Sequence, residues 1–367
     1  AQEIVREGLL DSVRHHLVSD VPVGAFLSAG IDSSSLVGLM RDAGQRDIKT
    51  ITLGFDEFTG HHNDESPLAK KLALHYGTSH TTRVISENEF HNDLSKILEK
   101  MDQPTIDGIN SWFVSKATQE IGLKVAISGL GGDELFGGYS SFLQIPTWTK
   151  RLSLTSKIPF LGDTFQKTLT MLSIFMPDLN SKLPGILKYG GSYSGNYFLR
   201  RGLFMPWELS EILDSDMAND GLKRLGLIKN FQEQNAIWPK KDFGQVASFE
   251  SINYMRNQLL RDADWTSMAH SLEVRVPLVD TTLLKNIAKI LVSFPHSNTD
   301  KHLLSSSPLK NLPDGFYKRS KTGFSTPMAS WISNSKMLAD QPLPNFVTNP
   351  RTSWARKWAC HVANKYD

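Results

Sequence analysis

The sequence predicts an α/β fold in which a parallel sheet is followed by a mostly helical C-terminal lobe. Strand and helix signals alternate over residues 1–145, as they do in parallel α/β sheets. After Tyr139 the alternation fades, prolines are scattered through the chain, and the readable segments are helical. We therefore expect two domains, one formed by residues 1–145 and the other by residues 146–367.

The individual elements follow from apolar spacing and from turn signals. Val5, Leu9 and Val13 recur at helical spacing and predict an amphipathic helix at the N-terminus. Short apolar and β-branched runs predict strands at residues 23–27, 48–55, 80–85 and 124–127. The predicted helices are residues 1–17, 32–39, 65–76, 90–101, 109–121, 249–260 and 282–292. Gly77 is the expected C-cap of the third of these helices.

The composition is that of a soluble globular enzyme. The 367 residues carry a formal net charge of +2, with 40% hydrophobic and 21% charged residues. This charge balance predicts no nucleic-acid partner, and no apolar run approaches the ~20 residues of a membrane span. Cys360 is the single cysteine, so the chain forms no internal disulfide. We expect a cytoplasmic protein without a membrane partner.

A turn of small residues follows the first predicted strand. Ser28-Ala29-Gly30 leads directly into a helix that carries Asp32, Ser33 and Ser34. Small residues let backbone N–H groups approach an anion, and a helix N-terminus attracts negative charge. The lysine of a Walker motif is missing, and Asp32 would repel a phosphate unless Mg²⁺ bridged the two. The alternative is a tight turn in which Asp32 is an ordinary helix cap.

A second loop of small residues follows the fourth predicted strand. Residues 128–139 contain five glycines within ten positions, together with Asp133 and Glu134. Dense glycine indicates close backbone approach or positive φ angles. Ligand sites lie beyond the carboxyl ends of parallel strands, so this loop is expected to face the first one. Asp32 and Asp133 would then share the bridging Mg²⁺; the alternative is a flexible glycine-rich connection.

Taken in order, these motifs resemble a known family. Residues 28–34 resemble the Ser-Gly-Gly-x-Asp-Ser loop of N-type ATP pyrophosphatases. Residues 128–139 resemble the Ser-Gly-x-Gly-x-Asp-Glu-x-Phe-Gly-Gly-Tyr signature of the asparagine synthetase branch. Further matches follow in the family's order at residues 64–66, 102–107, 260–280 and 321–324. The resemblance spans residues 1–335 and implies the adenine nucleotide alpha hydrolase-like fold of the family's C-terminal synthetase domain.

The resemblance also implies a nucleotide site that takes ATP and Mg²⁺. The residues implied to contact the nucleotide are Phe26, Leu27, Ser28, Gly30, Asp32, Ser33, Ser34, Leu53, Ser128 and Gly129. The implied metal ligands are Asp32 and Asp133, and the implied catalytic residues are Lys321, Asp133, Glu134 and Asp107. Lys321 begins a Lys-x-Gly-Phe segment, from which it would stabilise charge at the α-phosphate. Residues 267–280 are interpreted as architectural.

Two positions depart from the family pattern. Ala29 replaces the usual glycine, which is tolerable at a negative φ because alanine adds only a methyl group. Leu130 stands where the biosynthetic asparagine synthetases carry an acid near the acyl-adenylate. Leucine accepts no proton. Either Glu134, Asp107 or Asp102 takes that role, or the substrate is not simply aspartate.

Full-length glutamine-dependent members of this family resemble a two-domain chain whose N-terminal glutaminase uses a first-residue cysteine. Here residue 1 is Ala1, and Cys360 lies in the C-terminal tail. We therefore expect a fragment that lacks the glutaminase domain and uses free ammonia, another amine, or ammonia from a glutaminase domain or subunit. The family resemblance also points to a homodimer.

The activity implied by the resemblance is amide ligation in two steps. A carboxylate, expected to be the aspartate side chain, attacks the α-phosphorus of ATP and releases pyrophosphate. Ammonia then displaces AMP and gives asparagine. Alternatives with the same fold are a β-lactam synthetase-like ligase or peptide cyclase, or amidation of another carboxylate. An alternative of another class is a non-catalytic nucleotide-binding regulatory domain, whereas hydride transfer is excluded because no Gly-x-Gly-x-x-Gly follows the first strand.

Overall fold

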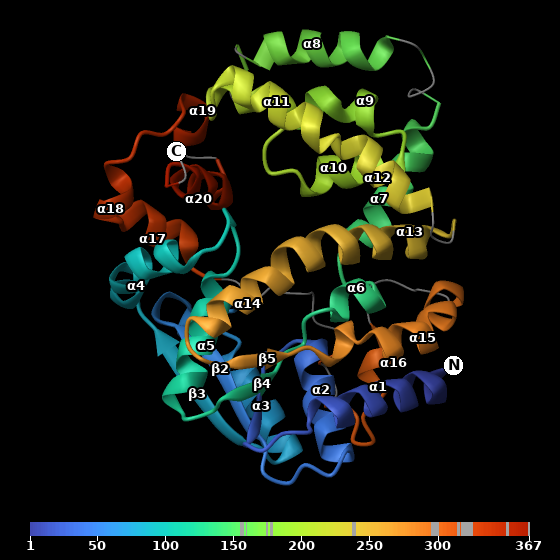
Figure 1. Ribbon diagram of the computed structural model, residues 1–367, viewed down its shortest axis with the longest axis vertical. Helices are drawn as coiled ribbons and strands as arrows, with labels where there is room; N and C mark the ends of the chain where they lie inside the picture. The colour runs from blue at the N-terminus through green and yellow to red at the C-terminus, as the bar shows by residue number, and fades with distance from the viewer. Residues whose placement is uncertain are drawn as a thin grey trace. The chain divides into compact units, whose positions relative to one another are not determined.

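The structure is a computed structural model that describes residues 1–154, 158, 160–173, 175–176, 179–236, 240–294, 301–313, 316, 326–349 and 352–365. The chain forms two compact units (Figure 1). One comprises residues 1–138 and 255–335, and the other comprises residues 139–254 and 336–367. The chain passes back into the first unit within a π-helical run, η5 (Glu250–Leu259).

A five-stranded parallel sheet forms the centre of the first unit. Its strands are β1 (Val23–Phe26), β2 (Lys49–Phe55), β3 (Ser79–Ile85), β4 (Val125–Ile127) and β5 (Glu273–Arg275), in the order β3-β2-β1-β4-β5. Ala25 of β1 pairs with Thr50 on one side and with Ile127 on the other. The predicted α/β class with a parallel sheet is therefore confirmed. The fifth strand was not among the four predicted.

Helices flank the sheet in two groups, and the helices of each group contact one another. One group contains α1 (Gln2–His16), α2 (Ile31–Asp42), α3 (Ser66–Tyr76), α15 (Thr281–Ser293) and α16 (His302–Ser305). The other contains α4 (Glu87–Lys100), α5 (Ile109–Glu120), α14 (Leu260–Met268) and α17 (Met328–Asn334). Short elements complete the unit: η1 (Asp56–Phe58), α6 (Gly132–Phe136) and η6 (Pro277–Val279). Helices on both faces explain why β1 and β4 are apolar runs without alternation.

Aromatic packing fixes α17 against this core. Trp331 is fully buried and stacks on Phe90 of α4, with a ring centroid distance of 5.0 Å. Phe55 of β2 and Phe113 of α5 meet the same indole edge-to-face, at 5.7 and 6.1 Å. The Trp331 side chain therefore joins α17 to β2, α4 and α5. Such aromatic pairs contribute about 0.5–1.5 kcal/mol each to stability beyond the burial of apolar area.

The described secondary-structure elements of the second unit are all helices. Its elements are α7 (Ser141–Leu152), α8 (Leu161–Ser173), η3 (Leu183–Gly185), α9 (Ile186–Tyr189), α10 (Tyr193–Arg201), η4 (Pro206–Glu211), α11 (Ser215–Leu225), α12 (Leu227–Ala236), α13 (Asp242–Phe249), α18 (Lys336–Ala339), α19 (Asn345–Thr348) and α20 (Trp354–Ala363). Its core cluster consists of Ile145, Tyr197, Val246 and Phe249. Within the described ranges, no helix combines the length and the apolar character that crossing a bilayer requires.

Candidate active site

The strand order places a topological switch point between β1 and β4. The chain adds β2 and β3 on one side of β1, then crosses to add β4 and β5 on the other. In open parallel sheets the crevice outside the carboxyl ends of the strands at such a point is the usual ligand site. The two strands pair in register, from Val23 with Val125 to Ala25 with Ile127, so the loops that follow them start side by side.

The first of these loops is held by serine hydroxyl groups. The Ser33 hydroxyl accepts a hydrogen bond from the backbone N–H of Ser28 at 3.1 Å and lies 3.0 Å from the Ser28 hydroxyl. The Ser34 hydroxyl donates to the carbonyl oxygen of Gly30 at 2.7 Å. Gly30 is the N-cap of α2 and contributes no side-chain cap. The positive end of α2 therefore opens onto a short loop of backbone amides and hydroxyls, as an anion site requires.

The second loop lies directly against the first, as the sequence predicts. A methyl group on Gly129 would come within 3.0 Å of both the Asp32 Cβ and the Ser33 backbone nitrogen. A methyl group on Gly132 would lie 2.5 Å from the Asp32 Oδ1. Gly131 has a φ of 90°, which an L side chain rarely adopts. The glycines of the second loop are thus required for close approach to Asp32.

Lys301 joins the two loops through Asp32 and Asp133. Its Nζ lies 2.6 Å from both carboxylate oxygens of Asp32 and 2.6 Å from the Oδ1 of Asp133. Burial alone would lower the pKa of Lys301, but attraction to Asp32 and then to Asp133 outweighs it, so the pKa is raised. Its φ is 44°, in the left-handed region that non-glycine residues seldom occupy. Lys301 carries no sequence motif and is not among the residues that the sequence predicts for the site.

The two carboxylates fit a Mg²⁺ ion that would also bind phosphate. Among the described residues, no group of three or more His, Cys, Asp or Glu side chains is arranged as a metal site. Mg²⁺ commonly takes only one or two carboxylates and completes its shell with water and substrate phosphates. Asp32 and Asp133 supply that number, and they already surround one cationic nitrogen.

A second group of acids surrounds the start of α5. Asp262 is 2% exposed and accepts hydrogen bonds from the Thr105 hydroxyl at 2.8 Å and the Trp265 indole N–H at 3.0 Å. Burial raises the pKa of Asp262 to about 7, against the effect of these donors, and the charges of Asp107 and Asp102 add to the increase. Asp262 lies in the sequence motif of residues 260–280 but is not among the predicted site residues.

The predicted acid Asp107 belongs to this second group. Its Oδ2 accepts a hydrogen bond from the Gln258 side-chain amide at 2.6 Å. Its backbone N–H donates to the Thr105 hydroxyl at 3.2 Å. Asp102, the other acid considered near it, pairs with Arg261 at 2.9 Å on the surface. Asp107 is therefore fixed in position by neighbours on both sides.

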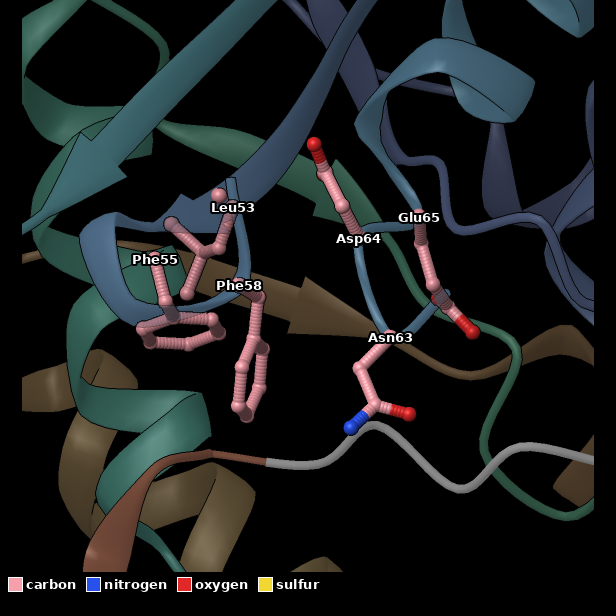
Figure 2. A pocket seen from close by; sticks show the side chains of 7 residues that line it. Leu53, Phe55, Phe58, Asn63, Asp64 and Glu65 are labelled. Atoms are coloured by element: carbon pink, nitrogen blue, oxygen red, sulfur yellow. The ribbon is translucent and has the colours of Figure 1, made fainter. Parts of the chain in front are cut away.

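A pocket lies beyond the carboxyl end of β2. Figure 2 shows its apolar wall, formed by Leu53, Phe55 and Phe58, opposite the loop side chains of Asn63 and Asp64. Asp64 also accepts a hydrogen bond from the Ser66 backbone N–H at 2.9 Å at the start of α3. Leu53, which is predicted to contact the nucleotide, thus lines this pocket.

The remaining predicted site residues are placed as follows. Phe26 ends β1 and is partly exposed, Leu27 is buried, and Ser128 is 7% exposed at the end of β4. Glu134 lies in α6 and is 2% exposed, so its carboxyl group faces the interior. Lys321 lies outside the described residues, and its role stays a sequence prediction.

Comparison with known proteins identifies the family of the chain. The family model described as asparagine synthase matches residues 4–344, which is nearly the whole chain. The chain belongs to the asparagine synthase family. The chain is 31% identical over 344 residues to asparagine synthetase [glutamine-hydrolyzing] 1 of Bacillus subtilis, which covers 90% of this chain and 50% of the relative. The predicted family is therefore confirmed.

Two further relatives show the range of the family. A putative glutamine-hydrolysing asparagine synthetase of Mycobacterium tuberculosis is 27% identical over 90% of this chain and 49% of its own length. The protein named amidase chry2 of Gibberella zeae is 26% identical over 90% of this chain and 53% of its own length. The chain spans about half the length of these curated relatives.

Proposed function

We propose that this chain is an ATP-dependent amide ligase that adenylates the side-chain carboxylate of aspartate and transfers ammonia to it. The products are asparagine, AMP and pyrophosphate. One observation carries the proposal: Asp32 and Asp133 meet around a single cation position beside the N-terminus of α2. Carboxylates repel phosphate, so a pair of them at an anion-binding helix end makes chemical sense for a metal–phosphate complex. The relatives named as asparagine synthetases support the substrate assignment.

In this proposal the chain's own residues bind and orient the nucleotide. The hydroxyls of Ser28, Ser33 and Ser34 and the amides at the start of α2 hold the phosphates that leave. The apolar wall with Leu53 takes the adenosine side. When bound, Mg²⁺ supplies positive charge that neutralises the phosphate oxygens. Catalysis of this type consists mainly of positioning and electrostatic stabilisation.

The proposed bond changes balance over two steps. In the first, a substrate carboxylate oxygen bonds to the α-phosphorus as the bond to the leaving pyrophosphate breaks. In the second, the ammonia nitrogen bonds to the acyl carbon, loses a proton, and AMP leaves with the C–O bond electrons. Lys321 is proposed to stabilise charge at the α-phosphate, with Glu134 or Asp107 as the acid near the acyl group.

Leu130 favours a second candidate function with the same first step. The backbone N–H of Leu130 donates a hydrogen bond to the Ser128 hydroxyl at 3.4 Å, which places Leu130 in the second loop. An apolar side chain at this place offers no anionic partner to an ammonium group or to the α-amine of aspartate. The second candidate is therefore a ligase that adenylates a different carboxylate or uses an amine within its own substrate.

The decisive experiment measures AMP and pyrophosphate release from MgATP with aspartate, with and without ammonium. We expect aspartate-dependent pyrophosphate and ammonium-dependent asparagine, both lost in Asp32→Ala and retained in the exposed control Asp20→Ala. Pyrophosphate release only with another carboxylate would replace the proposal by the second candidate. Nucleotide binding without turnover of any carboxylate would indicate a regulatory domain instead.

A further inference from the structure

We propose that Lys301 occupies the Mg²⁺ position between Asp32 and Asp133 until the nucleotide arrives, and that binding of the metal–nucleotide complex exchanges the ammonium for the metal. The inference rests on the proposed function in one respect, namely that these two aspartates are the metal ligands. It adds a role for a residue that lies 269 positions from Asp32 in the sequence.

The geometry leaves room for one cation between the carboxylates. The ammonium nitrogen contacts three carboxylate oxygens at 2.6 Å, in the place where a shared metal ion would bind both side chains. The backbone of Gly138 packs closely against this group. A methyl group on Gly138 would lie 1.8 Å from the Asp133 Oδ1 and 2.4 Å from the Lys301 Cε. A metal ion that binds both carboxylates at this position must therefore displace the ammonium.

Charge explains why the exchange needs the nucleotide. Two carboxylates and one ammonium leave this group with a single negative charge. Mg²⁺ added alone would face the repulsion of a buried ammonium whose carboxylate partners, within the described part of the chain, are Asp32 and Asp133. A nucleotide brings phosphate oxygens, which offer Lys301 a new partner as the metal takes its place. Metal and nucleotide should therefore bind cooperatively, each raising the affinity of the other.

A merely structural ion pair makes a different prediction. If Lys301 only neutralised two partly buried carboxylates, removing it would destabilise the protein, and Mn²⁺ binding by the parent would not depend on pyrophosphate. Under the exchange, removing it creates a vacant cation site, so metal binding without nucleotide is gained. A gain of binding is a result that loss of structure does not produce.

The experiment uses Mn²⁺ as the probe and follows free Mn²⁺ by electron paramagnetic resonance in nucleotide-free protein. We expect the parent and Lys285→Gln, an exposed control on α15, to bind little Mn²⁺. Lys301→Gln and Lys301→Ala should bind one Mn²⁺ at least about tenfold more tightly. Adding Asp133→Asn to Lys301→Gln should remove the gain.

Folded Lys301 variants without this gain would overturn the exchange. So would a parent protein that retains the same amount of Mn²⁺ with and without pyrophosphate, measured as protein-bound metal after gel filtration because pyrophosphate itself binds free Mn²⁺. If neither Lys301 variant folds, the comparison of the parent with and without pyrophosphate tests the exchange by itself. The exchange requires that Mn²⁺ binding by the parent depend on pyrophosphate. None of these measurements uses the proposed substrates, free aspartate and ammonia. Loss of the exchange and loss of ligase activity are therefore distinguishable results.

Discussion

At the scale of single residues, Gly132 determines whether Asp32 can hold its position. A methyl group there would lie 2.5 Å from the Asp32 Oδ1, which Lys301 already holds at 2.6 Å. We expect Gly132→Ala to lower the free energy of unfolding by about 1–3 kcal/mol, since the carboxylate must shift. ATP-dependent pyrophosphate release should be lost as well. Urea denaturation and a pyrophosphate assay measure the two effects.

The matched control is Gly221→Ala in α11, where an added methyl group meets nothing within 4 Å. Alanine is the better helix former, so this change should raise stability by about 0.5–1 kcal/mol and leave the assay unchanged. Equal behaviour of the two variants would contradict the steric account of Gly132.

Asp262 is the residue from which a pH dependence follows. Its carboxyl pKa is raised from 3.8 to about 7, chiefly by burial, so the folded protein binds this proton more tightly than the unfolded chain. The resulting stability is fully present below pH 3.8 and is lost as the pH rises through 7. We expect Asp262→Asn to remove this dependence, a change on the order of 4 kcal/mol at most.

Urea denaturation of the parent and of Asp262→Asn at several values from about pH 4 to about pH 8 tests this expectation. The amide stays neutral and still bonds one of its two partners, Thr105 or Trp265. The parent should lose stability relative to the variant as the pH rises. A difference between the two proteins that is constant with pH would show that Asp262 does not titrate in this range.

At the scale of elements, the N-terminus of α2 offers a comparison between two serines of one helix. The Ser33 hydroxyl holds the Ser28 amide at 3.1 Å, whereas the buried Ser35 hydroxyl has no hydrogen-bond partner within the described part of the chain. We expect Ser33→Ala to weaken binding of ATP about tenfold, because the loop loses an anchor and a donor. Ser35→Ala should leave it unchanged, as measured by calorimetry with MgATP. Equal affinities would exclude Ser33 from the phosphate site.

The elements also show what the sequence can predict. The ends of β1 to β4 and of α3, with Gly77 in the left-handed C-cap, agree with the predictions to about one residue because apolar runs and turn glycines are local signals. β5 escaped prediction because Glu273–Arg275 is short and two of its three side chains are charged. Arg275 donates instead to the carbonyls of His16 and Val18, a contact that no local pattern reveals.

The site was predictable to a similar degree. Asp32 and Asp133 lie in the first turns of helices that directly follow loops of small residues visible in the sequence, and the structure brings the two side chains together. Lys301 precedes a four-residue helix and carries no motif, so only folding shows that it belongs to the same site. Side chains that join a site through tertiary contact leave no periodic signal.

At the scale of the whole molecule, the division into two units predicts two separable unfolding transitions. Each unit has its own core, so each is expected to unfold cooperatively by itself. The described candidate nucleotide residues all belong to the unit formed by residues 1–138 and 255–335. MgATP should therefore raise the transition temperature of that unit, since ligand binding stabilises only the state that binds.

Glu250→Gln should act on the other transition. Glu250 is fully buried, pairs with Arg201 at 2.8 Å, and accepts a hydrogen bond from the Ser141 hydroxyl. Arg201 also lies over the rings of Tyr139 and Tyr254, so removing the carboxylate leaves a half-buried guanidinium without its counter-ion. The cost should be about 3–5 kcal/mol. In scanning calorimetry, the variant should lower one transition and MgATP should raise the other; a single transition that responds to both would show that the two units unfold as one.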